Sequence, residues 1–222
     1  MRQKLRENGL SLVLVAIFAV CMVGQTWAGW LADNDDRVRH GGAPEALVAY
    51  LHSGHFWEAT AENWESEFLQ MFAYVLLTAY FYQKGSSESR KLDAENPQDR
   101  DPRAHRRRPG APWPVRHGGG WLLRLYESSL ALAFLLLFLV SIVAHACGGL
   151  AAVNAERLEH HERALSLGEF VHDPAFWFQS LQNWQSEFLA LIAMVVLSIW
   201  LRQRRSPESK PVDAPHSETG SG

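Results

Sequence analysis

The sequence repeats itself at a spacing of 120 residues. Residues 1–91 align with residues 121–211 without a gap and are identical at 29 positions. The most similar stretch, NWESEFL at Asn63–Leu69, returns as NWQSEFL at Asn183–Leu189 with one residue changed. A gapless repeat of this length predicts two tandem copies of one folding unit, an arrangement that recurs in membrane proteins.

Apolar blocks alternate with charged ones along both copies. A membrane-spanning helix needs about 20 mostly apolar residues, whereas uninterrupted apolar runs of about 15 residues also suit a buried core helix. The first and third blocks meet the longer requirement, and the second and fourth have the shorter run. Trp57, Trp64, Tyr80 and Tyr82 favour the membrane, because Trp and Tyr concentrate at its interfaces. The predicted spans are therefore Leu10–Trp30, Trp64–Tyr82, Leu125–Leu150 and Trp184–Leu201.

The first block also fits a cleaved signal peptide, because it has a basic start, an apolar middle and small residues before Gly29. Its counterpart in the second copy is internal, however, and an internal segment is not a signal peptide. We therefore expect the first block to be retained as a span.

The distribution of basic residues predicts the orientation of the spans. Seventeen of the 21 Lys and Arg residues lie in the N-terminus, the central stretch 84–124 and the C-terminus, and four lie in the two other loops. Because basic loops stay in the cytoplasm, both termini and the central stretch should be cytoplasmic. The predicted fold is an all-α membrane protein with four transmembrane helices, arranged as two tandem parallel two-helix repeats.

Composition divides the chain into four parts: a first repeat at 1–85, a linker at 86–120, a second repeat at 121–205 and a tail at 206–222. The linker and tail are rich in Pro, Gly and charge, which predicts disorder. Arg106, Arg107 and Arg108 either contact anionic lipid headgroups or serve only as a topology signal on a flexible tether.

The second helix of each repeat has recognisable start signals. Asp173 followed by Pro174 predicts an N-cap and a first helical residue, and Ser53 is the equivalent cap in the first repeat. From these caps the helices should run to about Gln83 and Gln203. At 100° per residue, Glu67 falls in a polar stripe that should face protein, while Trp64 and Phe72 fall on the opposite, lipid-facing side.

The polar residues of these helices form the candidate sites. Small residues at Gly24 and Ala28, and at Ala144 and Gly148, should allow close helix approach. The residues expected to gather at the outer ends of the spans are Gln25, Asn63, Ser66, Glu67 and Gln70 in the first repeat, and His145, Asn183, Ser186 and Glu187 in the second. These clusters either join helices by hydrogen bonds or serve an ion, a proton or a ligand. A pairing of His145 with Glu187 would respond to pH near neutrality.

Several function classes find no support in the sequence. Cys21 and Cys147 lie in apolar blocks, so we interpret them as small buried hydrophobic residues rather than a disulfide. The sequence has no zinc-ligand spacing, no Gly-rich phosphate loop and no nucleophile motif. The histidines of the outer loops match no defined metal site. A net charge of −3 argues against a nucleic-acid surface. We therefore predict no catalytic residues, no metal and no cofactor.

Three long motifs carry a resemblance: RENGLSLVL at Arg6–Leu14, SGHFWEATAENWESEFLQM at Ser53–Met71 and RQRRSPESKPV at Arg202–Val212. With them the chain resembles a family of small bacterial integral membrane proteins whose function is unknown. The resemblance covers nearly the whole chain outside the linker. It implies a location in the bacterial cell membrane and brings no catalytic residues. Gly85 of the first repeat predicts a glycine at position 205, but this chain has Arg205 there. The difference affects only the predicted C-terminal cap of a helix.

The function predicted from these features is a non-enzymatic structural or partner-interaction module of the membrane. The alternative is a small transporter, channel or proton-coupled sensor that uses the clusters around Glu67 and Glu187. Expected partners are the lipid bilayer and either further copies of the chain or another membrane protein.

Overall fold

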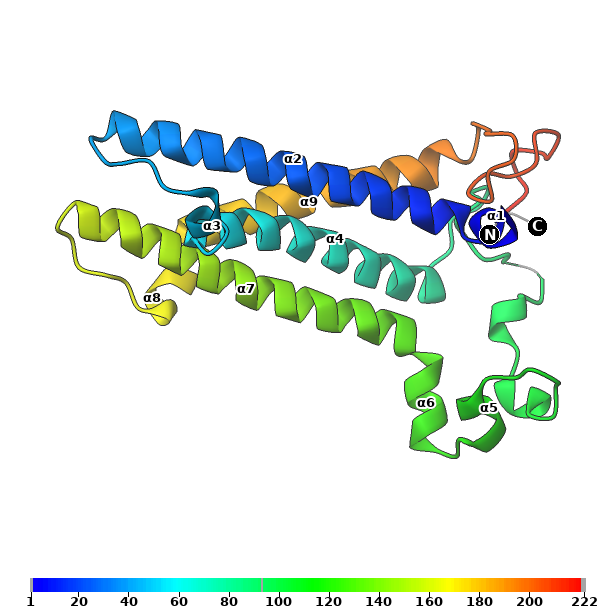
Figure 1. The fold of residues 1–222 in the computed structure, drawn as a ribbon. Coiled ribbons are helices and arrows are strands. Elements are labelled where there is room, and N and C mark those ends of the chain that lie inside the picture. The colour runs from blue at the N-terminus through cyan, green and yellow to red at the C-terminus, as the bar shows by residue number, and fades with distance from the viewer. Residues whose placement is uncertain (1, 93, 221–222) are drawn as a thin grey trace. The chain divides into compact units, whose positions relative to one another are not determined.

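The computed structural model describes every residue except 1, 93, 221 and 222, and the regular elements of the described residues are all helical (Figure 1). The predicted all-α class is therefore confirmed. The elements in chain order are α1 (Arg2–Glu7), α2 (Gly9–Arg39), α3 (Leu47–Tyr50), α4 (Gly54–Tyr80), η1 (Pro97–Asp99), η2 (Pro102–His105), α5 (Trp113–His117), α6 (Trp121–Glu127), α7 (Ser129–Glu159), α8 (Leu167–Val171) and α9 (Pro174–Leu197).

The chain divides into two compact units. One unit comprises Met1–Ala61 and Ala144–Asp173, and the other comprises Glu62–Val143 and Pro174–Gly222. The first therefore contains α2, α3, α8, the start of α4 and the end of α7. The second contains most of α4, the first half of α7, all of α9, and the segments that follow α4 and α9.

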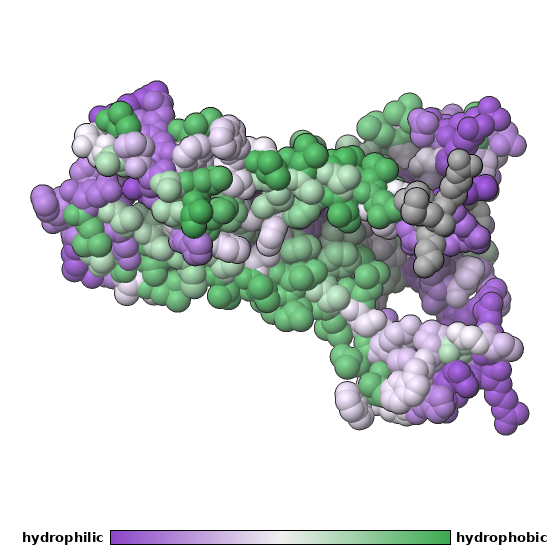
Figure 2. Space-filling model, in the orientation of Figure 1, coloured by the Kyte–Doolittle hydropathy of each residue, from purple (hydrophilic) through white to green (hydrophobic). Residues whose placement is uncertain are grey.

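Two helices, α2 and α7, are long and apolar enough to cross a membrane. Within the candidate span of α2 no residue is buried, and large apolar side chains such as Val15, Phe18 and Val20 are exposed. Hydrophobic side chains cover the visible surface of both helices, and hydrophilic ones gather where they end at Arg39 and Glu159 (Figure 2). Such a surface needs an apolar environment, because water contact with it is unfavourable.

The boundaries of α2 and α7 differ from the prediction. Both helices continue about nine residues past the apolar blocks, to Arg39 and Glu159, since charged residues extend a helix as readily as apolar ones. The predicted third span is also interrupted. Ser128 leaves helical geometry (φ −108°, ψ 8°) between α6 and α7, as Asn8 does between α1 and α2. Ser and Asn favour such breaks because their side chains compete for backbone hydrogen bonds.

After α2 and again after α7 the chain turns back and forms a short helix beside the long one (Figure 1). Asn34 clamps the first return, because its side chain donates to the Glu45 carbonyl (3.1 Å) and accepts from the Glu45 amide (2.6 Å). Asn154 makes the same two bonds with Leu165, at 3.0 and 2.7 Å. The two short helices formed in this way are α3 and α8.

The helices α4 and α9 begin where their caps predict. The Ser53 hydroxyl accepts from the Phe56 amide at 3.2 Å, and α9 starts at Pro174. They end earlier than Gln83 and Gln203, at Tyr80 and Leu197.

Arginines bond carbonyls at or just beyond the ends of both helices. The Arg90 guanidinium donates to Thr78 and Ala79, and that of Arg202 donates to Ser198 and Ile199. Beyond the helix ends, Gly85 and Arg205 both adopt positive φ, 86° and 74°. The backbone at Arg205 is therefore one that favours glycine, which is the residue the sequence comparison expects there.

Between α4 and α6, where the sequence predicts a disordered linker, the structure describes the short helices η1, η2 and α5. The tail after Arg205 makes specific side-chain contacts, which are described below. The division into two repeats, a linker and a tail stays a prediction.

Candidate functional site

The N-terminal half of α4 buries polar side chains. Ser66 and Gln70 are buried, as the polar stripe predicts. Glu65 is also buried, with none of its surface exposed, although the stripe does not include it. Glu67, which the sequence predicts to face inward, is instead exposed.

This error has a physical cause. The prediction assumed that α4 has one protein-facing side, so that residues on the opposite side contact lipid. Ala61 and Glu65 lie roughly opposite Ser66 and Gln70 at 100° per residue, yet all four are buried. This part of α4 is therefore enclosed on more than one face, and Glu67 projects from the gap between them.

Glu62, Glu65 and Gln70 of α4 contact α9 through three hydrogen bonds, which we call the α4–α9 polar seam. The Trp184 indole N–H donates to Glu65 Oε1 at 2.9 Å, and the Asn183 amide donates to Glu62 Oε1 at 2.6 Å. Deeper along α4, the Gln70 amide donates to the Glu187 carbonyl at 2.8 Å. Each of these bonds joins one copy of the NWxSEF motif, or the helix that carries it, to the other.

The seam is not symmetric. The positions equivalent to Glu62 and Glu65 in the second copy are Gln182 and Gln185, and both of these glutamines are exposed. Both carboxylates of the seam therefore come from α4, while α9 supplies N–H donors. Sequence reasoning missed Glu65 because it weighted the residues that the two copies share. The signal was the one variable position inside the motif, where the first copy has Glu and the second has Gln.

The other predicted site residues lie in varied surroundings. Gln25 is exposed and its amide donates to the Thr60 hydroxyl at 3.3 Å, while His145 is fully buried. Ser66 and Ser186 donate to carbonyls of their own helices, those of Asn63 and Asn183, at 2.8 and 2.9 Å. The pairing of His145 with Glu187 stays a prediction.

Of the two small-residue pairs, one contributes to helix packing. A Cβ atom on Gly148 would lie 2.6 Å from the backbone nitrogen of Glu58, so α7 and the start of α4 cross closely there. Gly24 has no atom within 4 Å of its Cβ position, so the close approach predicted at Gly24 is wrong. Composition alone does not reveal which side of a helix meets a neighbour, and α2 buries no residue at all.

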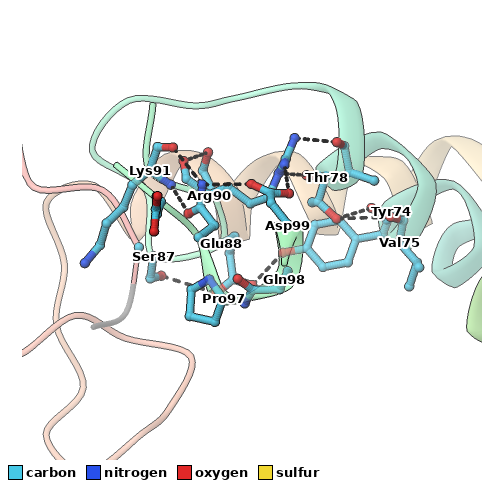
Figure 3. Close-up of a pocket in the computed structure, with 15 residues that line it drawn as sticks. Tyr74, Val75, Thr78, Ser87, Glu88, Arg90, Lys91, Pro97, Gln98 and Asp99 are labelled. Atoms are coloured by element: carbon cyan, nitrogen blue, oxygen red, sulfur yellow. Dashed lines mark hydrogen bonds and ion pairs between the residues drawn. The ribbon is translucent and has the colours of Figure 1, made fainter. Parts of the chain in front are cut away.

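A cavity of about 680 Å³ opens beside the C-terminal end of α4 (Figure 3). Its charged groups are largely paired with one another. The Tyr74 hydroxyl donates to Glu88 at 2.5 Å, and Arg90 forms an ion pair with Asp99 at 2.6 Å. Asp99 also accepts from the Asn96 amide at 3.2 Å. These pairs hold the segment after α4 against the helix.

The C-terminal tail folds onto the same segment through Lys210. The ammonium group of Lys210 is 1% exposed and donates to four carbonyl oxygens, those of Gly85, Pro215, His216 and Glu218, at 2.5 to 3.3 Å. Burial lowers the pKa of this group from its ordinary value. The carbonyl cage offsets the loss of water and fixes the tail to the turn that follows α4.

Metal binding was a further possibility raised by the histidines of the outer loops. In the part of the chain that the structure describes, no three His, Cys, Asp or Glu side chains gather to hold a metal ion. The outer histidines His40, His52 and His172 instead lie within hydrogen-bond distance of carbonyls one turn earlier in the chain.

These features define an all-helical protein with two helices that can span a membrane and a polar seam between α4 and α9. Residues 1–221 match the family described as Domain of unknown function (DUF6766), and the chain belongs to that family. No curated protein and no solved structure matches the chain.

Proposed function

We propose that this chain is a non-enzymatic integral membrane protein that acts as a structural or partner-interaction module. In this proposal α4 and α9 cross the bilayer together with α2 and α7, and the four spans form two tandem two-helix repeats. The location is the bacterial cytoplasmic membrane, with both termini on the cytoplasmic side.

The observation that carries the structural role is the α4–α9 polar seam. Its carboxylates are bonded to donors of the partner helix rather than left open for a solute. Glu65 accepts from Trp184 and Glu62 accepts from Asn183. Hydrogen bonds of this kind between membrane helices stabilise their association by about 0.6 to 2 kcal/mol each. The seam therefore supports a structural role, in which these hydrogen bonds hold α4 and α9 in register.

The tandem duplication is supported by contacts that recur 120 residues apart. The Asn34–Glu45 clamp corresponds to the Asn154–Leu165 clamp. The backbone N–H of Gln83 donates to the Ser89 hydroxyl, and that of Gln203 donates to the Ser209 hydroxyl, both at 2.9 Å. Recurrence of such local contacts favours two copies of one unit, each with a long helix, a return and a second helix.

The second candidate is a small transporter, channel or proton-coupled sensor, and one observation favours it. Glu65 is an ionisable group with no exposed surface, and an ionisable group in a membrane segment is costly enough to suggest a role. Of Glu65, Glu67 and Glu187, Glu65 is the buried one. This alternative function would therefore depend on Glu65 rather than on Glu67 or Glu187.

Proton and ion flux in proteoliposomes distinguishes the two candidates. The proposal predicts flux equal to that of empty liposomes for the wild type and for the Glu65→Gln and Glu67→Gln, Glu187→Gln variants. Flux in the wild type that Glu65→Gln abolishes would establish transport and overturn the structural proposal.

A further inference from the structure

The segment that precedes α7 is strongly basic. Between Pro102 and Tyr126 the chain has six arginines, two histidines and no acidic residue. In the described residues, Arg100, Arg103 and Arg108 are exposed and have no ion-pair partner. A charge concentrated in this way directly before a candidate span lies where anionic lipid headgroups are.

A cavity of about 500 Å³ opens where this segment begins, and residues between Pro97 and Val115 line it. Arg100, His105 and Arg108 line this cavity together with four prolines, and no carboxylate lines it. Each proline fixes its own φ angle, so the walls are stiff. Next to the cavity, the Arg106 guanidinium donates to the carbonyl of Gly118, the residue that follows α5, at 3.3 Å. We call this space the basic cavity.

Two exposed tryptophans lie at and beyond the C-terminal end of the stretch that lines the basic cavity. Trp113 of α5 is 62% exposed and stacks on His117 with 5.8 Å between ring centroids, and Trp121 of α6 is 73% exposed. Large exposed aromatic residues are unfavourable in water and are typical of the headgroup layer of a membrane. Charge and aromatic residues therefore indicate the same surroundings for this segment.

We propose that the basic cavity binds the phosphate group of an anionic phospholipid headgroup, with Trp113 and Trp121 in the surrounding headgroup layer. Guanidinium groups suit phosphate, because their N–H donors match its oxygens. This inference rests on the proposed membrane insertion of α7, which places the basic cavity at the cytoplasmic surface. It assigns the arginines a ligand and goes beyond a role as a topology signal.

The test uses the full chain in a neutral detergent, and native mass spectrometry measures the ratio of bound phosphatidylglycerol to bound phosphatidylcholine. Arg100→Gln, Arg108→Gln removes two cavity charges. Arg103→Gln, Arg107→Gln is the matched control, because it removes two exposed arginines of the same segment that do not line the basic cavity. Thermal unfolding of each variant establishes that it is folded. Inorganic phosphate and a short RNA are added as competitors.

The wild type should prefer phosphatidylglycerol, and the cavity variant should lose about 30-fold of that preference, because it loses two guanidinium–phosphate contacts of about 1 kcal/mol each. The control variant should lose less than about threefold. Equal losses in both variants would overturn the cavity site in favour of diffuse charge attraction. Displacement of lipid by millimolar phosphate, or tighter binding of RNA, would overturn the choice of lipid. Extraction of the chain from membranes at alkaline pH would instead contradict the proposed membrane insertion. The lipid measurement is made in detergent, so failure of the cavity site and failure of the proposed function are distinguishable.

Discussion

Two glutamates two residues apart have opposite roles because they project from different sides of one helix. Glu65 is enclosed and accepts the indole N–H of Trp184, while Glu67 is exposed. The repeated motif predicts that a glutamate of this stretch belongs to the site, and this much can be inferred from the sequence. It does not reveal which glutamate is buried, because burial depends on how many neighbours surround α4.

Replacement of Glu65 by Ala should therefore destabilise the protein far more than replacement of Glu67 by Ala. The first change leaves the Trp184 N–H without its acceptor in a buried place, which costs about 1 to 3 kcal/mol. The second removes an exposed carboxylate and should alter stability by about 0.5 kcal/mol or less. Thermal unfolding in detergent, followed by circular dichroism, measures both. Equal effects of the two changes would contradict the polar seam.

At the scale of elements, local signals located the starts of helices better than their ends. Ser53 and the Asp173–Pro174 pair fix the starts of α4 and α9, because capping depends on neighbouring residues only. At the end of α4, Arg90 reaches back from the following segment and bonds the Thr78 carbonyl. Contacts of that kind arise only once the chain has folded, so the apolar pattern extends past the true end.

Packing between elements leads to a second prediction, which contrasts Gly148 with Gly24. Gly148→Ala places a methyl group 2.6 Å from the backbone of α4, so the helices must separate and stability should fall by about 1 to 3 kcal/mol. Gly24→Ala meets open space and should be neutral or stabilising by up to about 1 kcal/mol, because alanine favours the helix. Unfolding temperatures of the two variants test this directly. A larger loss for Gly24→Ala would show that α2 packs through that residue.

A third prediction concerns the pH dependence of α8. Glu169 completes a capping box with Ser166 and pairs with Arg163 at 2.6 Å, and these contacts lower the pKa of Glu169 to about 2. A lowered carboxylate pKa contributes stability that is present above its ordinary value, 4.5, and is lost as pH falls toward 2. The wild type should therefore unfold at a higher temperature than Glu169→Gln at pH 6, and the difference should shrink between pH 4.5 and 2. A difference that stays constant over that range would exclude this cause.

At the scale of the whole molecule, the 120-residue repeat was the most informative feature of the sequence. It predicts paired elements throughout the chain. The clamps at Asn34 and Asn154, and the helix breaks at Asn8 and Ser128, lie at matching positions. The repeat does not predict where the two copies differ. The seam takes its carboxylates from one copy only, and Lys210 of the tail binds the turn after α4.

The central claim is that α4 and α9 cross the membrane as well as α2 and α7. If only α2 and α7 crossed, the linker after α4 would lie on the side opposite the N-terminus. If all four cross, the linker and both termini lie on one side. Ala104 reports on this difference, because it is exposed and lies in the linker.

The deciding measurement is labelling of single cysteines by a membrane-impermeant maleimide in intact cells, in a chain whose Cys21 and Cys147 have been replaced. We predict labelling at Asp35→Cys and His160→Cys, and none at Ala104→Cys until the cells are opened. Labelling of Ala104→Cys in intact cells, together with protection of His160→Cys, would show that only α2 and α7 cross and would contradict the four-span account.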